Sequence, residues 1–285
     1  MGNKILVTAD STCDLSPELK ERYGIRITPL HVILDGEDRR DGVNVDPDEI
    51  YRVYREKKVL PKTAAVNVQE YIDFFKPLVE EGYEVIHITL GSALSCCYQN
   101  CCLAAEELPQ VHPVDSASLS TGSGLMVLEI HDMIEAGRSV EEILAAVPQI
   151  RANCHASFVI DTLDFLYKGG RCSALAMLGA NLLQIKPSIE VSTEDGSMDV
   201  AKKYRGSLDK ALLTYVKDKL ENRTDLKTHR IFITHSGISE ERVQMVRERI
   251  QEFQQFDEIL VTRAGCTVSS HCGPNTLGIL FMTKY

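Results

Sequence analysis

Residues 85–95 read Val85-Ile-His-Ile-Thr-Leu-Gly-Ser-Ala-Leu-Ser95, an apolar run that ends in small and hydroxyl residues. The apolar part has the length of one buried strand, and the Gly/Ser turn leads into a helix expected from about Leu94 to Leu108. Similar strand, loop and helix patterns begin at Ile5–Thr8 and at Val111–Asp115. Strands that alternate with helices at this spacing predict a parallel sheet with helices on its faces.

The second half of the chain has a different pattern. Two apolar strands flank the polar stretch Thr193–Ser197, which indicates a hairpin, and further strands and helices follow as far as Met282. The sequence therefore predicts a two-domain α/β protein. Residues 1–155 would form an N-terminal α/β domain with a parallel sheet and flanking helices, and residues 156–285 a C-terminal α/β domain with a mixed sheet.

Composition excludes several classes of protein. Hydrophobic residues make up 44% of the chain and charged residues 25%, which is ordinary for a globular protein and excludes wholesale disorder. The net charge of −10 argues against a partner nucleic acid, because general electrostatic binding needs a basic face. No secretory signal precedes the strand at Ile5, and no apolar run suits a membrane span, so we expect a soluble, cytoplasmic protein.

The chain has nine cysteines, four of them in one cluster. Without an export signal they indicate reduced thiols. Cys97 and Cys101 would share one face of a helix, with Cys96 and Cys102 beside them. Packing of small apolar side chains is one interpretation, and a soft-metal or redox site is the other. Because no CxxC or HxxxH pair accompanies the cluster, we expect neither a metal nor a cofactor.

Polar loops follow three of the predicted strands, at Asp10–Thr12, Gly91–Ser95 and Asp115–Ser118. Ligands of an open parallel sheet bind beyond the carboxyl ends of its strands, and hydroxyl groups with free N–H groups suit an anion. For any single loop, an ordinary helix N-cap is the alternative. The chain lacks the P-loop, dinucleotide and nucleophile-elbow motifs, so a P-loop nucleotide enzyme is not supported.

Two segments of the second half add candidate anion ligands. In Gly169-Gly-Arg171 an arginine follows two glycines, which suits a guanidinium placed on a carboxylate or phosphate. A surface arginine after a helix end is the alternative. His271 stands beside the turn Gly273-Pro274, where it would donate to an anion or serve a structural role.

At these residues the sequence resembles the DegV family, bacterial fatty-acid-binding proteins that include the acyl-binding subunit of fatty acid kinase. The motifs that carry the resemblance occur in order over essentially the whole chain: Asp10-Ser-Thr-Cys-Asp-Leu15, Pro29-Leu30 with Asp41-Gly42, Leu94-Ser95 with Tyr98-Gln99, Val114-Asp-Ser116, Gly169-Gly-Arg171, Ile185-Lys-Pro187, Arg205-Gly206, and His271 with Gly273-Pro274.

The resemblance implies that a long-chain fatty acid lies within or between two α/β domains. Its carboxylate would be held by a Thr, a Ser, an Arg and a His, which here are Thr63, Ser92, Arg171 and His271. The resemblance also implies a carrier without catalytic residues of its own, which presents the fatty acid to a partner kinase that makes acyl phosphate.

The chain departs from the family pattern in several places. Of the usual Thr-Ser-Gln-Pro-Ser, only the first hydroxyl remains, at Thr63. Small or apolar residues also replace a Ser, a Gly and a Thr near Ser92, and Asn275 replaces a Gly. We therefore expect rearranged head-group contacts, which leaves open a nonstandard acyl ligand. The departures near Thr63 and Ser92 are Ala64, Ala65, Val66, Asn67, Gly91, Cys96 and Cys97.

The sequence also contains candidate residues for contact with the acyl tail of the fatty acid and with the partner kinase. The uncharged run Cys172–Ile185 would form the tunnel wall, or alternatively an ordinary core helix. Arg205 with Lys203 would form a docking patch for the kinase, with a solvated basic face as the alternative. Two rival functions remain open: a thiol-dependent hydrolase or transferase that uses Cys96, Cys97 or Cys272, and a metal or redox sensor built on the cysteine cluster.

Overall fold

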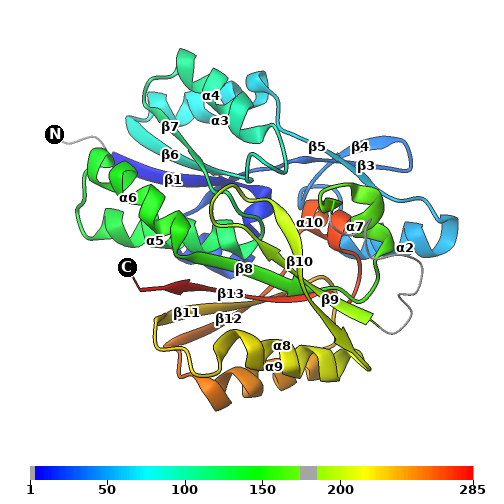
Figure 1. Cartoon of the computed structure of the whole chain (residues 1–285). Helices are drawn as coiled ribbons and strands as arrows, with labels where there is room; N and C mark the ends of the chain where they lie inside the picture. Colours follow the sequence, from blue (N-terminus) through cyan, green and yellow to red (C-terminus); the bar gives the residue numbers. More distant parts are fainter. Residues whose placement is uncertain (1–3, 174–184, 285) are drawn as a thin grey trace.

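The computed structural model describes residues 4–173 and 185–284 (Figure 1). In its first half, four strands form a sheet in the order β2-β1-β6-β7, and every neighbouring pair is parallel. The predicted parallel sheet is therefore confirmed. Its strands are β1 (Lys4–Asp10), β2 (Arg26–Thr28), β6 (Tyr83–Thr89) and β7 (Val111–Asp115).

Helices of the first half include α1 (Pro17–Arg22), α3 (Val68–Glu80), α4 (Cys97–Glu107), α5 (Thr121–Glu135) and α6 (Val140–Ala152), and α2 is described below with the small sheet. A serine before a proline is a typical helix start, and Ser16 is the N-cap of α1: its Oγ accepts the Leu19 N–H at 3.3 Å. Helix α4 begins at Cys97 and not near Leu94. The reason is a hydrogen-bonded turn before it, in which the Leu94 N–H donates to the Gly91 carbonyl at 2.9 Å.

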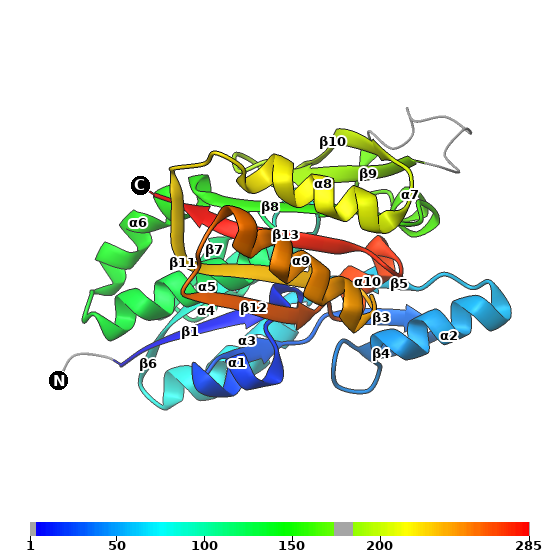
Figure 2. The same cartoon turned by 90° about the horizontal axis from the view of Figure 1, so that it is seen from below.

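The second half contains a six-stranded sheet in the order β10-β9-β8-β13-β11-β12. Only β11 and β12 are parallel, so the predicted mixed sheet is confirmed, and β9 with β10 forms the predicted hairpin. Helices α8 (Leu208–Leu220) and α9 (Glu240–Phe253) lie together on one side of this sheet (Figure 2). The strands are β8 (Cys154–Val159), β9 (Ile185–Val191), β10 (Met198–Arg205), β11 (Leu226–His235), β12 (Glu258–Arg263) and β13 (Leu277–Thr283).

Helix α5 lies between the two large sheets. It contacts β1 and β6 of the parallel sheet and β8 and β13 of the mixed sheet. Residues 121–130 of this helix are all buried. The largest hydrophobic core runs from Val7 in β1 to Met282 in β13, so both halves of the chain share it. The division at residues 155 and 156 stays a prediction.

A third, small antiparallel sheet has the order β4-β3-β5 and lies near α2. The sequence predicts one strand over residues 26–34, but the structure divides it into β2 and β3 at Pro29 and Leu30. There the Leu30 N–H donates to the Ser11 Oγ instead of to a strand. The elements of this region are η1 (Ser11–Cys13), β3 (His31–Leu34), β4 (Glu37–Arg40), α2 (Pro47–Lys57), β5 (Lys62–Ala64), α7 (Asp164–Gly169) and α10 (Cys266–Cys272).

Helix α10 connects this region to the rest of the molecule. It contacts α2, α7, β3, β5 and η1, which come from both halves of the chain. Of the run expected to line a tunnel, residues 174–184 lie outside the described residues, and Cys172 is buried. Within residues 4–173 and 185–284, no helix has the length and apolarity needed to cross a membrane.

Candidate functional site

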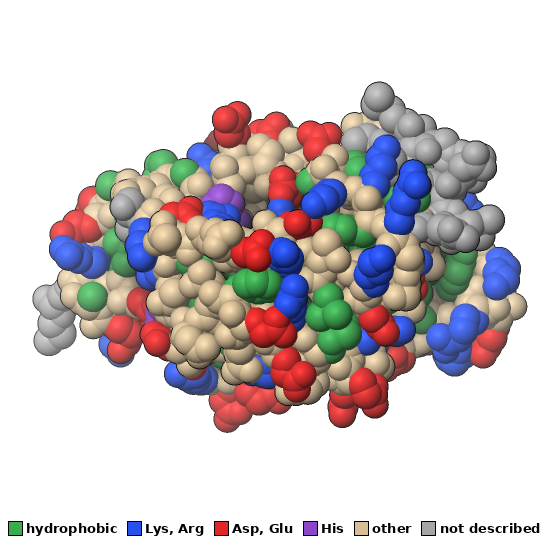
Figure 3. Space-filling model, turned by 60° about the horizontal axis from the view of Figure 1, so that its bottom comes forward, with side chains coloured by type: hydrophobic (Ala, Val, Ile, Leu, Met, Phe, Trp, Pro, Cys, Tyr) green, Lys and Arg blue, Asp and Glu red, His purple; other side chains and the backbone are tan. Residues whose placement is uncertain are grey.

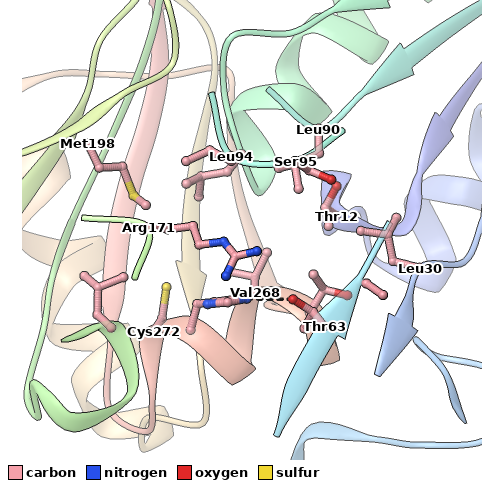
Figure 4. A pocket seen from close by; sticks show the side chains of 15 residues that line it. Thr12, Leu30, Thr63, Leu90, Leu94, Ser95, Arg171, Met198, Val268 and Cys272 are labelled. Carbon is pink, nitrogen blue, oxygen red and sulfur yellow. Dashed lines mark hydrogen bonds between the residues drawn. The ribbon is translucent and has the colours of Figure 1, made fainter. Parts of the chain in front are cut away.

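A cavity is lined by side chains from both halves of the chain (Figure 4). Its walls are mostly apolar and include a few polar groups, which is typical of small-molecule sites. The apolar lining consists of Leu30, Ala64, Leu90, Leu94, Leu119, Leu166, Met198, Val268 and Cys272. The polar lining consists of Thr12, Thr63, Ser95, Arg171, Thr267 and His271.

Thr63 and His271 form a hydrogen-bonded pair in the cavity wall. The Thr63 Oγ1 lies 2.8 Å from the His271 Nε2. Thr63 is held on β5, whose partner is β3, and His271 lies on α10. A Cβ on Gly169 would lie 2.4 Å from the His271 Nδ1, so the glycine allows α7 to approach the imidazole closely. The Thr63–His271 hydrogen bond therefore depends on the packing of β5, α10 and α7 against one another.

The imidazole of His271 is neutral at pH 7. Burial lowers its pKa to about 4, and the positive charge of Arg171 contributes in the same direction. Its Nδ1 is buried and has no hydrogen-bond partner within the described part of the chain. A neutral imidazole offers one donor and one acceptor; here Nε2 is hydrogen-bonded to Thr63, and Nδ1 lies against Gly169 of α7.

Arg171 brings a positive charge to the same cavity. Helix α7 ends at Gly169, Gly170 adopts the left-handed conformation with φ 68°, and the chain then turns to Arg171. The exposed guanidinium donates from Nη1 to the Gly169 carbonyl at 2.8 Å, its only hydrogen bond within residues 4–173 and 185–284. It extends across the cavity toward the side where Thr12 and Thr63 lie (Figure 4). This charge is available to an anion.

Ser92 lies apart from the other three predicted ligands. It is exposed, and both its Oγ (2.6 Å) and its N–H (3.0 Å) donate to the Asp115 carboxylate. The turn that precedes α4 places Ser95 in the cavity wall instead, where its Oγ accepts the Cys97 N–H at 3.2 Å. The structure thus brings together Thr63, Arg171 and His271. A ligand-binding role for Ser92 stays a prediction.

The three loops expected at one sheet edge contribute unequally. Thr12 of the first loop and Leu90, Leu94 and Ser95 of the second line the cavity, whereas residues 115–118 do not. The Asp10 carboxylate is buried, and it accepts hydrogen bonds from the Tyr71 hydroxyl (2.7 Å) and the Leu90 N–H (2.8 Å). Its part in this region is therefore structural.

Two buried carboxylates hydrogen-bond to groups on different elements around the cavity. Neither was predicted as a site residue from the sequence. Asp41 accepts the Ser11 hydroxyl at 3.0 Å and the N–H groups of Cys266 (2.7 Å) and Thr267 (3.0 Å). Asp14 accepts the Ser120 hydroxyl at 2.6 Å and the Gly265 N–H at 2.8 Å. Burial raises the pKa of Asp14 to about 8. Both Asp14 and Asp41 belong to motifs that carry the family resemblance, and this could have identified them from the sequence.

The cysteines named as candidate nucleophiles lie in different surroundings. Burial raises the pKa of Cys97 to about 12 and that of Cys272, in the cavity wall, to about 12 as well. Protonated buried thiols are poor nucleophiles, so neither supports a thiol enzyme. Cys96 is exposed. Within the two described ranges, no three His, Cys, Asp or Glu side chains are grouped to hold a metal ion.

Comparison with known proteins adds to this geometry. A family model described as "Uncharacterised protein, DegV family" matches residues 4–284. A DegV domain-containing protein of Caldanaerobacter subterraneus is 30% identical over 284 residues, which cover 99% of each chain. A DegV domain-containing protein of Clostridium acetobutylicum is also 30% identical, over 99% of each chain.

Solved structures resemble the whole fold. A DegV family protein of Thermus thermophilus, described in terms of fatty acid binding, has a TM-score of 0.88 and 32% identity, with 98% of this chain and 99% of that chain covered. A stearic-acid-binding protein of Eubacterium ventriosum has a TM-score of 0.85 and 27% identity, with 99% of both chains covered.

Proposed function

The chain belongs to the DegV family, and on that premise we propose that it binds a long-chain fatty acid in the cavity lined by Thr63, Arg171 and His271. The observation that carries the proposal is the combination of a mostly apolar cavity with a small polar cluster that includes the Arg171 guanidinium, which has no ion pair within residues 4–173 and 185–284. The solved relatives described as binding fatty acids support the same ligand class.

The energetics of the site fit this ligand. An acyl chain contributes about 0.8 kcal/mol for each methylene that leaves water, so the apolar walls supply affinity. A carboxylate that enters a protein costs free energy unless it is hydrogen-bonded and paired with a charge. Arg171 supplies the charge, and the Thr63–His271 pair supplies neutral hydrogen-bonding groups. These groups would therefore fix the orientation of the ligand.

We further propose that the protein presents the carboxylate to a separate kinase that makes acyl phosphate. Arg205 and Lys203, the predicted docking residues, lie exposed on β10. Lys202 beside them pairs with Asp218 at 2.6 Å, so it is less available to a partner. Lys and Arg side chains gather over the part of the molecule formed by β10 and α8 (Figure 3). This face suits an acidic surface of the partner.

Two experiments test the two parts separately. For binding, the purified protein is delipidated and offered a mixture of fatty acids, and the retained ligand is identified by mass spectrometry. Absence of both co-purified and acquired fatty acid contradicts the proposal. For presentation, acyl phosphate is measured after addition of a fatty acid kinase catalytic subunit and ATP. The double variant Lys203→Glu, Arg205→Glu should lose phosphorylation while it keeps fatty acid binding, and Lys76→Glu at an exposed position of α3 serves as the control.

A further inference from the structure

Two threonine hydroxyls in the cavity wall have no hydrogen-bond partner among the residues that the structure describes. Thr12 is 1% exposed and Thr267 is 3% exposed, and both line the cavity. In the part of the chain that the structure describes, neither Oγ1 atom makes a hydrogen bond. Because buried hydroxyls are nearly always paired, two such groups in the wall of one cavity are suited to bind a polar atom of a ligand.

The two elements that carry these hydroxyls, η1 and α10, both hydrogen-bond to the Asp41 carboxylate. Asp41 binds the hydroxyl of Ser11, which precedes Thr12 on η1, and it also binds the N–H of Thr267 on α10. The elements η1 and α10 are in contact. Thr12 and Thr267 therefore belong to one rigid part of the wall, and their positions relative to the cavity are fixed.

This pair lies beside the head-group cluster and not within it. Thr267 and His271 are four residues apart on α10, so they share one face and lie one turn apart. A helical turn rises by about 5.4 Å, which corresponds to only a few carbon atoms of an extended acyl chain. The cluster of Thr63, Arg171 and His271 already provides donors for the two oxygens of a carboxylate.

We propose that Thr12 and Thr267 form a second polar subsite that binds a hydroxyl group on the acyl chain near its carboxyl end. The preferred ligand is then a hydroxy fatty acid. This inference rests on the fatty acid binding proposed above. A ligand hydroxyl can donate to one threonine and accept from the other, so it would satisfy both buried groups at once.

The test compares palmitic acid with 3-hydroxypalmitic acid in a competition assay on the delipidated protein. The hydroxy acid should bind about three- to tenfold more tightly, as one or two added hydrogen bonds require. In the isosteric variants Thr12→Val and Thr267→Val the ratio of the two affinities should fall to about one, and the ratio decides even where both affinities change. Thr28→Val is the matched control, because that hydroxyl is also buried and has no partner within the described ranges, but it does not line the cavity.

Three outcomes contradict the inference. Equal binding of both acids by the wild-type protein contradicts the second subsite but not the proposed fatty acid binding. This comparison uses only the wild-type protein, so it holds even if a variant fails to fold. Equal weakening of both acids by Thr12→Val and Thr267→Val would assign the two hydroxyls to the carboxylate instead. Binding of neither acid contradicts the proposed fatty acid binding as well, so the two failures are distinguishable.

Discussion

The Thr63 Oγ1 lies 2.8 Å from the His271 Nε2, although 208 positions separate the two residues in the chain. Thr63 belongs to the small antiparallel sheet, and His271 belongs to α10, which follows the last parallel strand pair. The polar side of the cavity therefore forms only when the first and second halves of the chain pack against each other.

Replacement of Arg171 should weaken ligand binding more than it weakens the fold. Arg171→Met removes the positive charge that faces the carboxylate, and we expect about ten- to hundredfold weaker fatty acid binding. Because the guanidinium is exposed, stability should change by less than about 0.5 kcal/mol. Calorimetric titration and urea unfolding measure the two effects. Arg138→Met on the surface is the control, and unchanged affinity in Arg171→Met would refute the assignment.

A methyl group at residue 169 should displace the imidazole of His271. In Gly169→Ala the new Cβ would overlap the His271 Nδ1, so the Thr63 hydrogen bond should be lost. We expect severalfold weaker fatty acid binding and a loss of stability of about 1 to 3 kcal/mol, as for overpacking elsewhere. The double variant Gly169→Ala, His271→Ala should recover the stability lost to overlap. Additive effects of the two substitutions would contradict the predicted clash.

Stability should fall in mild acid because of His271. Its pKa is about 4 in the folded protein and near 6.5 when exposed, so the unfolded chain takes up the proton first. The stabilising contribution is therefore complete above pH 6.5 and is lost as pH falls through about 4, with a magnitude of about 3 kcal/mol. Urea unfolding of the delipidated protein at pH 7.5, 5.5 and 4.5 should show this slope. His271→Gln should show a shallower slope, since burial also lowers the pKa of His155 and His235 and their contribution remains, and an equal slope in that variant would be the contrary result.

Removal of the Asp41 carboxylate should separate η1 from α10. Asp41→Ala leaves the Ser11 hydroxyl and two N–H groups of α10 without their acceptor, and we expect a loss of about 3 to 5 kcal/mol. Asp48→Ala, which removes an exposed partner of Arg263, should cost about 1 kcal/mol or less. Chemical unfolding compares the two variants. Similar small losses in both would show that Asp41 does not hold these elements.

Local sequence patterns predicted most of the large elements. The parallel sheet, the β9–β10 hairpin and the cap at Ser16 follow from hydrophobic runs and turn residues, which depend on near neighbours in the chain. Helix α10 was not predicted, because its Cys, Thr and Ser residues form no apolar stripe of helical period. Its position is set by contacts with five other elements, and these cannot be read from its own sequence.

The site was predicted in part. The family resemblance named Thr63, Arg171 and His271, which the structure places around one cavity. Spacing alone could not have brought them together, since they come from separate elements. The difference between Ser92 and Ser95 depends on a single turn, in which Asp115 holds Ser92 at the surface. The motif predicted the loop but not which of its hydroxyls faces inward.

Because the cavity walls come from both halves of the chain, a ligand in the cavity would contact both halves and stabilise their packing. An occupied protein should also resist heat and proteolysis, with about 2.7 kcal/mol of added stability when free ligand exceeds its dissociation constant a hundredfold. Ligand binding would thus stabilise the folded protein against unfolding.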